Sequence, residues 1–593
     1  MTLSRDVLFD KIYACWLGKN IGGTLGAPVE GVKEPMQLTW YPKTYETGAV
    51  ENDDLDLQLC NLQAAERYGT RLSSTHLARG FLEHVFFPYD EYGYALTALR
   101  SGLTPPFSGC YDNPFIDCMG SPIRSELWAC IAPGNPGLAA YLAYQDAVVD
   151  HAGGEGMYGE IFQAALQSLA FICDDKVQLI KQALEYIPSS SRTYRAVADT
   201  LRWHQEGKTY TCIRQKILDE HGRDNFTDAP QNIAFTVLGL LSGADFEDGL
   251  LKTVNLGYDT DCTVATLGAL YGILYGSAYI PQKWSDPIGE RIVVSAPIKG
   301  LRAPKNLKEL TERTMVLQQK FALEDSSLYT LKYPENFDYN YSIETIPTGV
   351  PQGEGLTVYI GYPNGASVSP AQPLRIPITL TPPSDGTWIV SARLVCPDGI
   401  SGDLTGFDSP LLLTGKRSGE ITIISKGNIP HQNTLQLIVC RRLADGTLWN
   451  EYPIGISVLR AARWKLSGQT HYIDGTKITF DKPMPNGIYL AETTLTLTKE
   501  LPVRLMFATT AALTVTLDGK EVLSAPQITS VVPAYHRCEK DRVYSSTLSA
   551  GTHTLAIRMQ SDCPPTIIFA PVDYTATYAE GARYRMLDVE IGI

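Results

Sequence analysis

The stretch Glu51-Asn52-Asp53-Asp54-Leu55-Asp56 decides how the first half of the chain is expected to fold. An apolar pattern with helical spacing follows it directly, from Leu55 to Ala65. Asn52 is a favourable N-cap, and the two aspartates after it would lie in the first turn, where the helix dipole favours negative charge. The stretch therefore predicts the start of a helix, and capping alone would explain its acids.

A second acidic stretch, Gly257-Tyr258-Asp259-Thr260-Asp261-Cys262-Thr263, precedes another apolar segment from Val264 to Tyr279. Asp259 and Asp261 repeat the arrangement of carboxylates at the start of a helix. If the two starts faced each other, their acids would repel one another unless a cation lay between them. Carboxylate oxygens suit Mg²⁺, Mn²⁺ or Ca²⁺, so we expect one or two ions of this kind.

Composition narrows the class of protein. The 593 residues predict several domains, and contents of 44% hydrophobic and 19% charged residues are typical of a soluble globular protein. The net charge of −14 argues against nucleic acid as a partner. We expect a cytoplasmic protein with reduced cysteines, because Met1–Asp10 holds no apolar signal and the 12 cysteines form no CxxC pair. The apolar segment 263–280 is interpreted as a buried helix, so no membrane partner is expected.

The periodicity of the sequence divides the chain. Residues 1–325 predict an all-α catalytic domain, and residues 326–355, rich in Tyr, Pro, Thr and Gly, predict a linker. Short alternating segments in 356–462 predict an Ig-like β-sandwich. Those in 463–593 predict a second β-sandwich of the jelly-roll, carbohydrate-binding-module type. The expected fold class is multidomain, with a helical domain followed by two β-sandwiches.

The first helix expected in the chain carries a stripe of glycines, Gly18, Gly22 and Gly26, at a spacing of four residues. On a helix this spacing forms one smooth face, against which another helix can pack closely. Pro28 would end the helix and place Glu30 just beyond it. Close helix packing alone would explain the glycines, and a glutamate after a helix is commonly a solvated loop residue.

Several stretches of the helical part, in this order, resemble the ADP-ribosylglycohydrolase family. They are GGTLGAPVE (22–30), ENDDLD (51–56), the loops GSPIR (120–124), PGNPG (133–137) and DHAGGEGMYGE (150–160), and GYDTDCTVAT (257–266). The likeness covers roughly residues 6–285, and the two acidic motifs together carry most of its specificity.

The resemblance implies a fold of packed helices around divalent cations. The metal ligands that it implies are Asn52, Asp53, Asp54, Asp259, Asp261 and Cys262. The catalytic residues would be Glu30, Asp53 and Asp54. The substrate-binding residues would be Gly120, Ser121, Arg124, Asn135, His151, Tyr158 and Tyr258. A lone histidine is more often buried and hydrogen-bonded than functional.

Three positions depart from the family's pattern. Asn52 stands where the family has a hydroxyl residue, although its amide oxygen is still a ligand for a hard cation. Cys262 replaces a threonine, and a thiol is a poor magnesium ligand. Tyr258 replaces a glycine and adds a ring at the edge of the site.

These features predict a metal-dependent glycohydrolase that cleaves an N- or O-glycosidic bond at the anomeric carbon of a ribosyl substrate, ADP-ribosyl or related. Such a bond breaks through an oxocarbenium-like state. One alternative is a glycoside hydrolase for a carbohydrate without ADP-ribose, which the two sandwiches favour. The other is a non-catalytic ligand-binding relative. The expected partner is a small sugar or ADP-ribosyl molecule, and the sequence indicates no oligomeric state.

Overall fold

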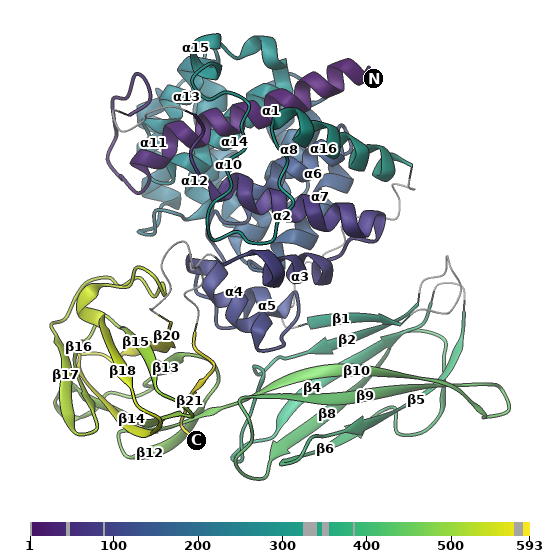
Figure 1. Ribbon diagram of the computed structural model, residues 1–593, viewed down its shortest axis with the longest axis vertical. Coiled ribbons are helices and arrows are strands. Elements are labelled where there is room, and N and C mark those ends of the chain that lie inside the picture. Colours follow the sequence, from purple (N-terminus) through teal and green to yellow (C-terminus); the bar gives the residue numbers. More distant parts are fainter. Residues whose placement is uncertain are drawn as a thin grey trace. The chain divides into compact units, whose positions relative to one another are not determined.

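The structure is a computed structural model that describes residues 3–42, 48–86, 89–323, 341–346, 355–383, 386–573 and 585–593, with 341–346 described for the backbone alone. The chain forms two compact units. The helical unit comprises Met1–Phe86 and Pro114–Asp338, and the strand-rich unit comprises Phe87–Asn113 and Tyr339–Ile593. Figure 1 shows the helices of the first unit and the two groups of strands of the second.

The helical unit confirms the all-α fold predicted for the first half of the chain. Its α-helices are α1 (Arg5–Gly26), α2 (Asp53–Tyr68), α3 (Ser74–His84), α6 (Ser125–Ile131), α7 (Pro136–Ala147), α8 (Glu155–Ala170), α9 (Lys176–Leu184), α10 (Arg192–Gln205), α11 (Tyr210–His221), α12 (Ala229–Ser242), α13 (Phe246–Val254), α14 (Thr260–Tyr275), α15 (Gln282–Ser285) and α16 (Leu307–Ala322). Short 3-10 turns are η1 (Ala27–Val29), η2 (Gly69–Arg71), η3 (Pro122–Arg124) and η4 (Ser277–Tyr279).

Helix α14 is the buried centre of this unit. Its side chains are buried from Thr260 to Leu274, and it packs against α1, α8, α12 and α13. This burial agrees with the interpretation of 263–280 as a core helix. In the described part of the chain, no helix has the length and apolar character needed to cross a bilayer.

Helices α1 and α14 touch backbone to backbone along the glycine stripe. A Cβ on Gly22 would lie 2.2 Å from the carbonyl oxygen of Val264, and one on Gly26 would lie 2.4 Å from that of Thr260. Helix α14 contributes glycines of its own, because a Cβ on Gly268 would lie 2.3 Å from the Gly18 carbonyl oxygen. The stripe therefore sets the distance between the two helices.

We predict that Gly22→Ala destabilises the helical unit by at least about 2 kcal/mol, because the added methyl would force the two backbones apart. Urea unfolding followed by circular dichroism measures the change. Gly80→Ala in α3 is the matched control: its Cβ would meet Ala64 Cβ at an ordinary 3.9 Å, so stability should change by less than about 1 kcal/mol. Equal effects of the two substitutions would contradict the role of the stripe.

The strand-rich unit contains two β-sandwiches and two helices, α4 (Asp90–Arg100) and α5 (Phe107–Cys110). The strands of the first sandwich are β1 (Tyr341–Ile346), β2 (Leu356–Gly361), β3 (Ser367–Val368), β4 (Leu374–Thr381), β5 (Trp388–Val395), β6 (Ile400–Thr405), β7 (Leu411–Leu413), β8 (Arg417–Ser425), β9 (Gln432–Arg442) and β10 (Leu448–Arg460). They form sheets in the orders β1-β2-β4-β8-β6 and β3-β10-β9-β5-β7.

The strands of the second sandwich are β11 (Ala462–Leu466), β12 (Gln469–Ile473), β13 (Lys477–Thr479), β14 (Ile488–Leu497), β15 (Leu501–Ala508), β16 (Ala512–Leu517), β17 (Lys520–Ala525), β18 (Val543–Leu548), β19 (Gly551–Gln560), β20 (Thr566–Val572) and β21 (Val589–Ile591), with the 3-10 turns η6 (Pro485–Gly487) and η7 (Lys540–Arg542). One sheet has the order β12-β11-β14-β19-β16-β17, with β21 beside β14, and the other has the order β13-β20-β15-β18.

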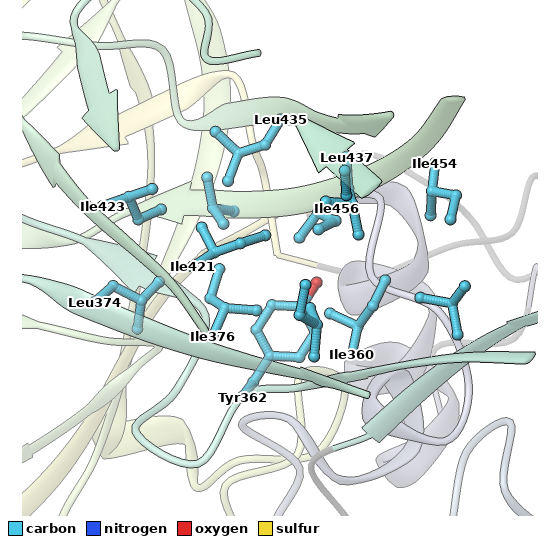
Figure 2. Packing of buried hydrophobic residues seen from close by; sticks show 14 of the residues in the cluster. Ile360, Tyr362, Leu374, Ile376, Ile421, Ile423, Leu435, Leu437, Ile454 and Ile456 are labelled. Atoms are coloured by element: carbon cyan, nitrogen blue, oxygen red, sulfur yellow. The ribbon is translucent and has the colours of Figure 1, made fainter. Parts of the chain in front are cut away.

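Period-two alternation of side chains produces both sandwich cores. In β4 the buried residues Leu374, Ile376 and Ile378 point to one face of the strand. Figure 2 shows Leu374 and Ile376 with isoleucines and leucines of β8, β9 and β10, so that one apolar core lies between the two sheets. The second sandwich has its own core, to which β16 contributes Leu513 and Val515 between exposed or half-buried threonines.

The segment 87–113 lies in the strand-rich unit, although its helical pattern placed it within the predicted 1–325 domain. The ring of Phe107 stacks on Tyr362 with centroids 4.6 Å apart. The Tyr111 hydroxyl donates to Asp474 Oδ1 at 2.5 Å. Periodicity reports the local conformation of a segment and not its distant partners, so the sequence did not indicate this placement.

Part of the predicted linker 326–355 is also a strand. β1 pairs antiparallel with β2, from Tyr341 opposite Gly361 to Ile346 opposite Leu356. Tyr341 and Ile343 alternate with the polar Ser342 and Glu344, which was the available signal for a strand. The rest of the linker, apart from residue 355, lies outside the described residues.

A fragment of residues 1–325 is expected to expose apolar side chains of the segment 87–113 that belong to the first sandwich core, among them Ala98, Leu103 and Phe107. It should therefore bind a hydrophobic dye and self-associate. The same fragment with residues 87–113 replaced by a Gly-Ser linker should bind less dye and self-associate less. Light scattering and dye fluorescence compare the two fragments, and equal behaviour would argue against the placement of this segment.

Candidate metal and active site

The start of α2 forms as the sequence predicts. Asn52 is the N-cap, and its Oδ1 accepts the N–H of Asp54 at 2.7 Å. The Asn52 amide lies so close to α1 that a Cβ on Gly23 would be 2.2 Å from Nδ2. Asp54 is fully buried, whereas Asp53 is half-buried. Of the three first-turn aspartates, Asp54 and Asp56 thus lie in the protein interior.

The start of α14 is held against the chain that follows α1 by two backbone hydrogen bonds. The Gly31 N–H donates to the Tyr258 carbonyl at 2.9 Å, and the Tyr258 N–H donates to the Val32 carbonyl at 2.7 Å. Tyr258 has a φ of 69°, a left-handed conformation that favours glycine. These bonds fix the backbone directly after Glu30 and directly before Asp259.

Two groups of potential ligand atoms share Asp261. In the acidic group, one oxygen each of Glu30, Asp259 and Asp261 lie within 4.8 Å of one another. In the thiol group, one atom each of Asp54, Asp261 and Cys262 lie equally close. Within the described residues, Asp53 belongs to neither group. The structure thus brings together residues from the end of α1, the start of α2 and the start of α14.

The acidic group contains oxygens that protein donors leave unsatisfied. Oδ1 of Asp259 and Oδ1 of Asp261 are buried, and neither has a hydrogen-bond partner within the described part of the chain. Buried carboxylate oxygens are rarely left unpaired because desolvation is costly. Three carboxylates with two such oxygens fit a hard divalent cation.

Electrostatic repulsion in this group leads to the same conclusion. Burial raises the pKa of Asp259 well above its usual range, and Asp261 and Glu30 raise it further. Burial also raises the pKa of Asp261, with further contributions from Glu30 and Asp54. Buried acids this close cannot all ionise without a compensating positive charge. A divalent cation would supply that charge.

The thiol group already has a positive charge beside it, which the sequence did not indicate. Lys19 on α1 is 1% exposed, and its Nζ lies 3.3 Å from Asp54 Oδ2 and 3.1 Å from Glu126 Oε2. Burial alone would lower the pKa of Lys19, but Glu126 and Asp54 outweigh burial and raise it. The Cys262 thiol donates to Asp54 Oδ1 at 3.5 Å. A lone lysine within an apolar helix was the only signal in the sequence.

Some of the predicted substrate-binding residues lie in a separate buried network. Arg124 is fully buried and pairs with Asp146 at 3.0 Å and with Asp150 at 2.7 Å. The Ser121 hydroxyl donates to Glu160. Such pairing satisfies charges in the interior and holds α7 and α8 to the loop before α6.

The other predicted substrate-binding residues are dispersed. His151 is fully buried beside Asp150, at 2.9 Å. Asn135 caps α7 by accepting the N–H of Leu138 at 3.2 Å. Gly120 is buried, and Tyr158 and Tyr258 are half-buried. A role of these residues in substrate binding stays a prediction.

The sequence profile of the family described as ADP-ribosylglycohydrolase matches residues 4–320. The chain belongs to the ADP-ribosylglycohydrolase family. This membership supports a glycohydrolase-type function, and therefore a hydrolase. The family generally binds divalent metals, in line with the two ligand groups of this ADP-ribosylglycohydrolase domain.

Individual relatives are distant. An uncharacterized protein of Archaeoglobus fulgidus is 22% identical over 298 residues, which cover 48% of this chain and 92% of the relative. A solved structure described as an ADP-ribosylglycohydrolase-related protein complex is 20% identical, covers 53% of this chain and 99% of its own, and has a TM-score of 0.39. A secreted serine protease, VesC from Vibrio cholerae, is 9% identical over 36% of this chain and 50% of its own, with a TM-score of 0.16.

The raised pKa values predict a specific pH dependence for the ADP-ribosylglycohydrolase domain after EDTA treatment. An acid whose pKa is higher in the folded state favours folding when protonated, so stability should fall as pH rises above about 4. Asp261→Asn removes one charge and should raise the melting temperature at pH 8. Thermal unfolding between pH 5 and pH 8 measures both effects.

The same substitution should abolish the stabilisation that Mn²⁺ gives the wild type, because an ion that binds only the folded state stabilises it. Asp219→Asn, at an exposed position on α11, is the control. It should change neither the melting temperature at pH 8 nor the stabilisation by Mn²⁺. A Mn²⁺ response that survives Asp261→Asn would contradict the role of the Asp261 charge in binding the ion.

Proposed function

We propose that the protein is a divalent-metal-dependent glycohydrolase that cleaves an N- or O-glycosidic bond at the anomeric carbon of a ribosyl substrate, ADP-ribosyl or related. The observation that carries this proposal is the pair of buried oxygens on Asp259 and Asp261 that have no hydrogen-bond partner among the described residues, in one group with Glu30. Oxygen ligands of this kind favour Mg²⁺ or Mn²⁺ over softer metals. Asn52 and Asp53 are the further ligands that we propose from the start of α2.

In this proposal the residues of the chain have different tasks. When bound, the cation would orient the sugar hydroxyls and lower the pKa of a water molecule. Asp259 and Asp261 are buried and hold the ion. Glu30 is exposed and can exchange protons with solvent. We assign to Glu30 the role of general base, which takes the proton of the water that attacks the anomeric carbon.

The positive charge that develops on the sugar is favoured by the carboxylates around it. The acidic group lies at the start of the buried helix α14. Its carboxylates are therefore held in position before the substrate binds. The substrate therefore meets a preorganised negative site, with Glu30 as the one exposed member of that group.

A carbohydrate without a pyrophosphate is the second candidate substrate. The strand-rich unit favours this candidate, since jelly-roll folds occur among sugar-binding lectins.

We predict that Glu30→Gln lowers turnover by at least about a hundredfold, the usual contribution of a general base, without changing the melting temperature. Glu34→Gln is the matched control, four residues further along the same loop and exposed, and should retain normal turnover. Near-normal turnover in Glu30→Gln would remove this residue from the mechanism.

The substrate is tested on the full chain with Mn²⁺, using ADP-ribosyl-arginine, ADP-ribosyl-serine and p-nitrophenyl glycosides. Release of ADP-ribose supports the first candidate. Cleavage of a simple glycoside alone supports the second. A protein that binds Mn²⁺ and the sugars but cleaves none of them would be a non-catalytic relative.

A further inference from the structure

The two ligand groups differ in how far their charge is already compensated. The acidic group of Glu30, Asp259 and Asp261 contains buried oxygens to which no donor in the described part of the chain is bonded. The thiol group of Asp54, Asp261 and Cys262 has the Lys19 ammonium beside it. We propose that Lys19 takes the place of a second metal ion, so that the protein binds a single divalent cation, at the acidic group. This inference rests on the proposed metal site and specifies its stoichiometry.

Both carboxylate oxygens of Asp54 are engaged by the protein. Oδ2 lies 3.3 Å from Lys19 Nζ, and Oδ1 accepts the Cys262 thiol hydrogen at 3.5 Å. A cation bound to Asp54 would have to share one of these oxygens with a protein donor. It would also lie close to a buried ammonium, where two positive charges repel each other strongly.

Lys19 cannot move away easily. Its neighbour Gly18 packs against the backbone of α14, where a Cβ would lie 2.1 Å from the Gly268 carbonyl oxygen. Its Nζ has a second anchor in Glu126, which is fully buried and also accepts from the Gln58 amide at 2.9 Å. Removal of the ammonium would leave two buried carboxylates without a positive charge beside them.

The nature of the ligands favours the same assignment. The acidic group offers three carboxylates, which suit Mg²⁺ or Mn²⁺. The thiol group offers a sulfur atom in place of one oxygen, and sulfur binds these ions weakly. Asp261, shared by both groups, is then free to serve the acidic group alone.

The test is the number of Mn²⁺ ions bound per full-length chain after EDTA treatment and desalting. Electron paramagnetic resonance of free Mn²⁺ gives this number, and isothermal titration calorimetry checks it. We expect one ion for the wild type and two for Lys19→Met, in which the side chain keeps its length and loses its charge. Lys11→Met is the matched control, because Lys11 also lies on α1 but donates only to backbone carbonyls of α14, and should leave one ion.

Two ions in the wild type would overturn this inference and leave the proposed function standing. No ion in the wild type would overturn both. One ion in a folded Lys19→Met protein would show that Lys19 does not control the stoichiometry.

A second variant keeps the inference testable if Lys19→Met fails to fold. Cys262→Thr replaces sulfur by oxygen and retains the ammonium, so it should still bind one ion. A rise to two ions in Cys262→Thr would show that the sulfur excludes the second ion, and the role given to Lys19 would be wrong.

Discussion

Between α1 and α14 the two backbones touch, and the rest of the site depends on this contact. The glycines of α1 leave no room for side chains between the helices, and the Thr260 hydroxyl donates to the carbonyl of Gly26 at 2.9 Å. Glu30, four residues after α1 ends, is therefore placed beside the first turn of α14. The same rigid approach carries Lys19 to Asp54 at the start of α2. An exposed carboxylate, buried acids and a buried ammonium thus lie in one place.

The sequence was most informative about features that depend on local backbone geometry, such as helix caps and helix packing. Capping rules predicted the start of α2 at Asn52, and the glycine spacing predicted a close helix contact on α1. The resemblance to a family then predicted that the two acidic starts meet. The groups formed by Asp54, Asp259 and Asp261 have that arrangement. The cap and the glycine stripe are each encoded within one short segment, which is why the sequence reveals them.

Long-range partners were the part that the sequence did not reveal. Arg124 matched a predicted substrate loop, but its partners Asp146 and Asp150 are on another stretch of the chain. Nothing near Lys19 in the sequence indicated Asp54 as its partner. The segment 87–113 has helical periodicity and lies in the strand-rich unit. In each case a distant contact decides the role of a residue whose local pattern allows several roles.

The central claim is that the acids at the starts of these helices bind a hard cation, and anomalous scattering from crystals grown with Mn²⁺ tests it most directly. The account predicts an anomalous peak within coordination distance of Asp259, Asp261 and Glu30. A well-ordered crystal that contains Mn²⁺ but shows no anomalous peak near Asp259 and Asp261 would contradict it.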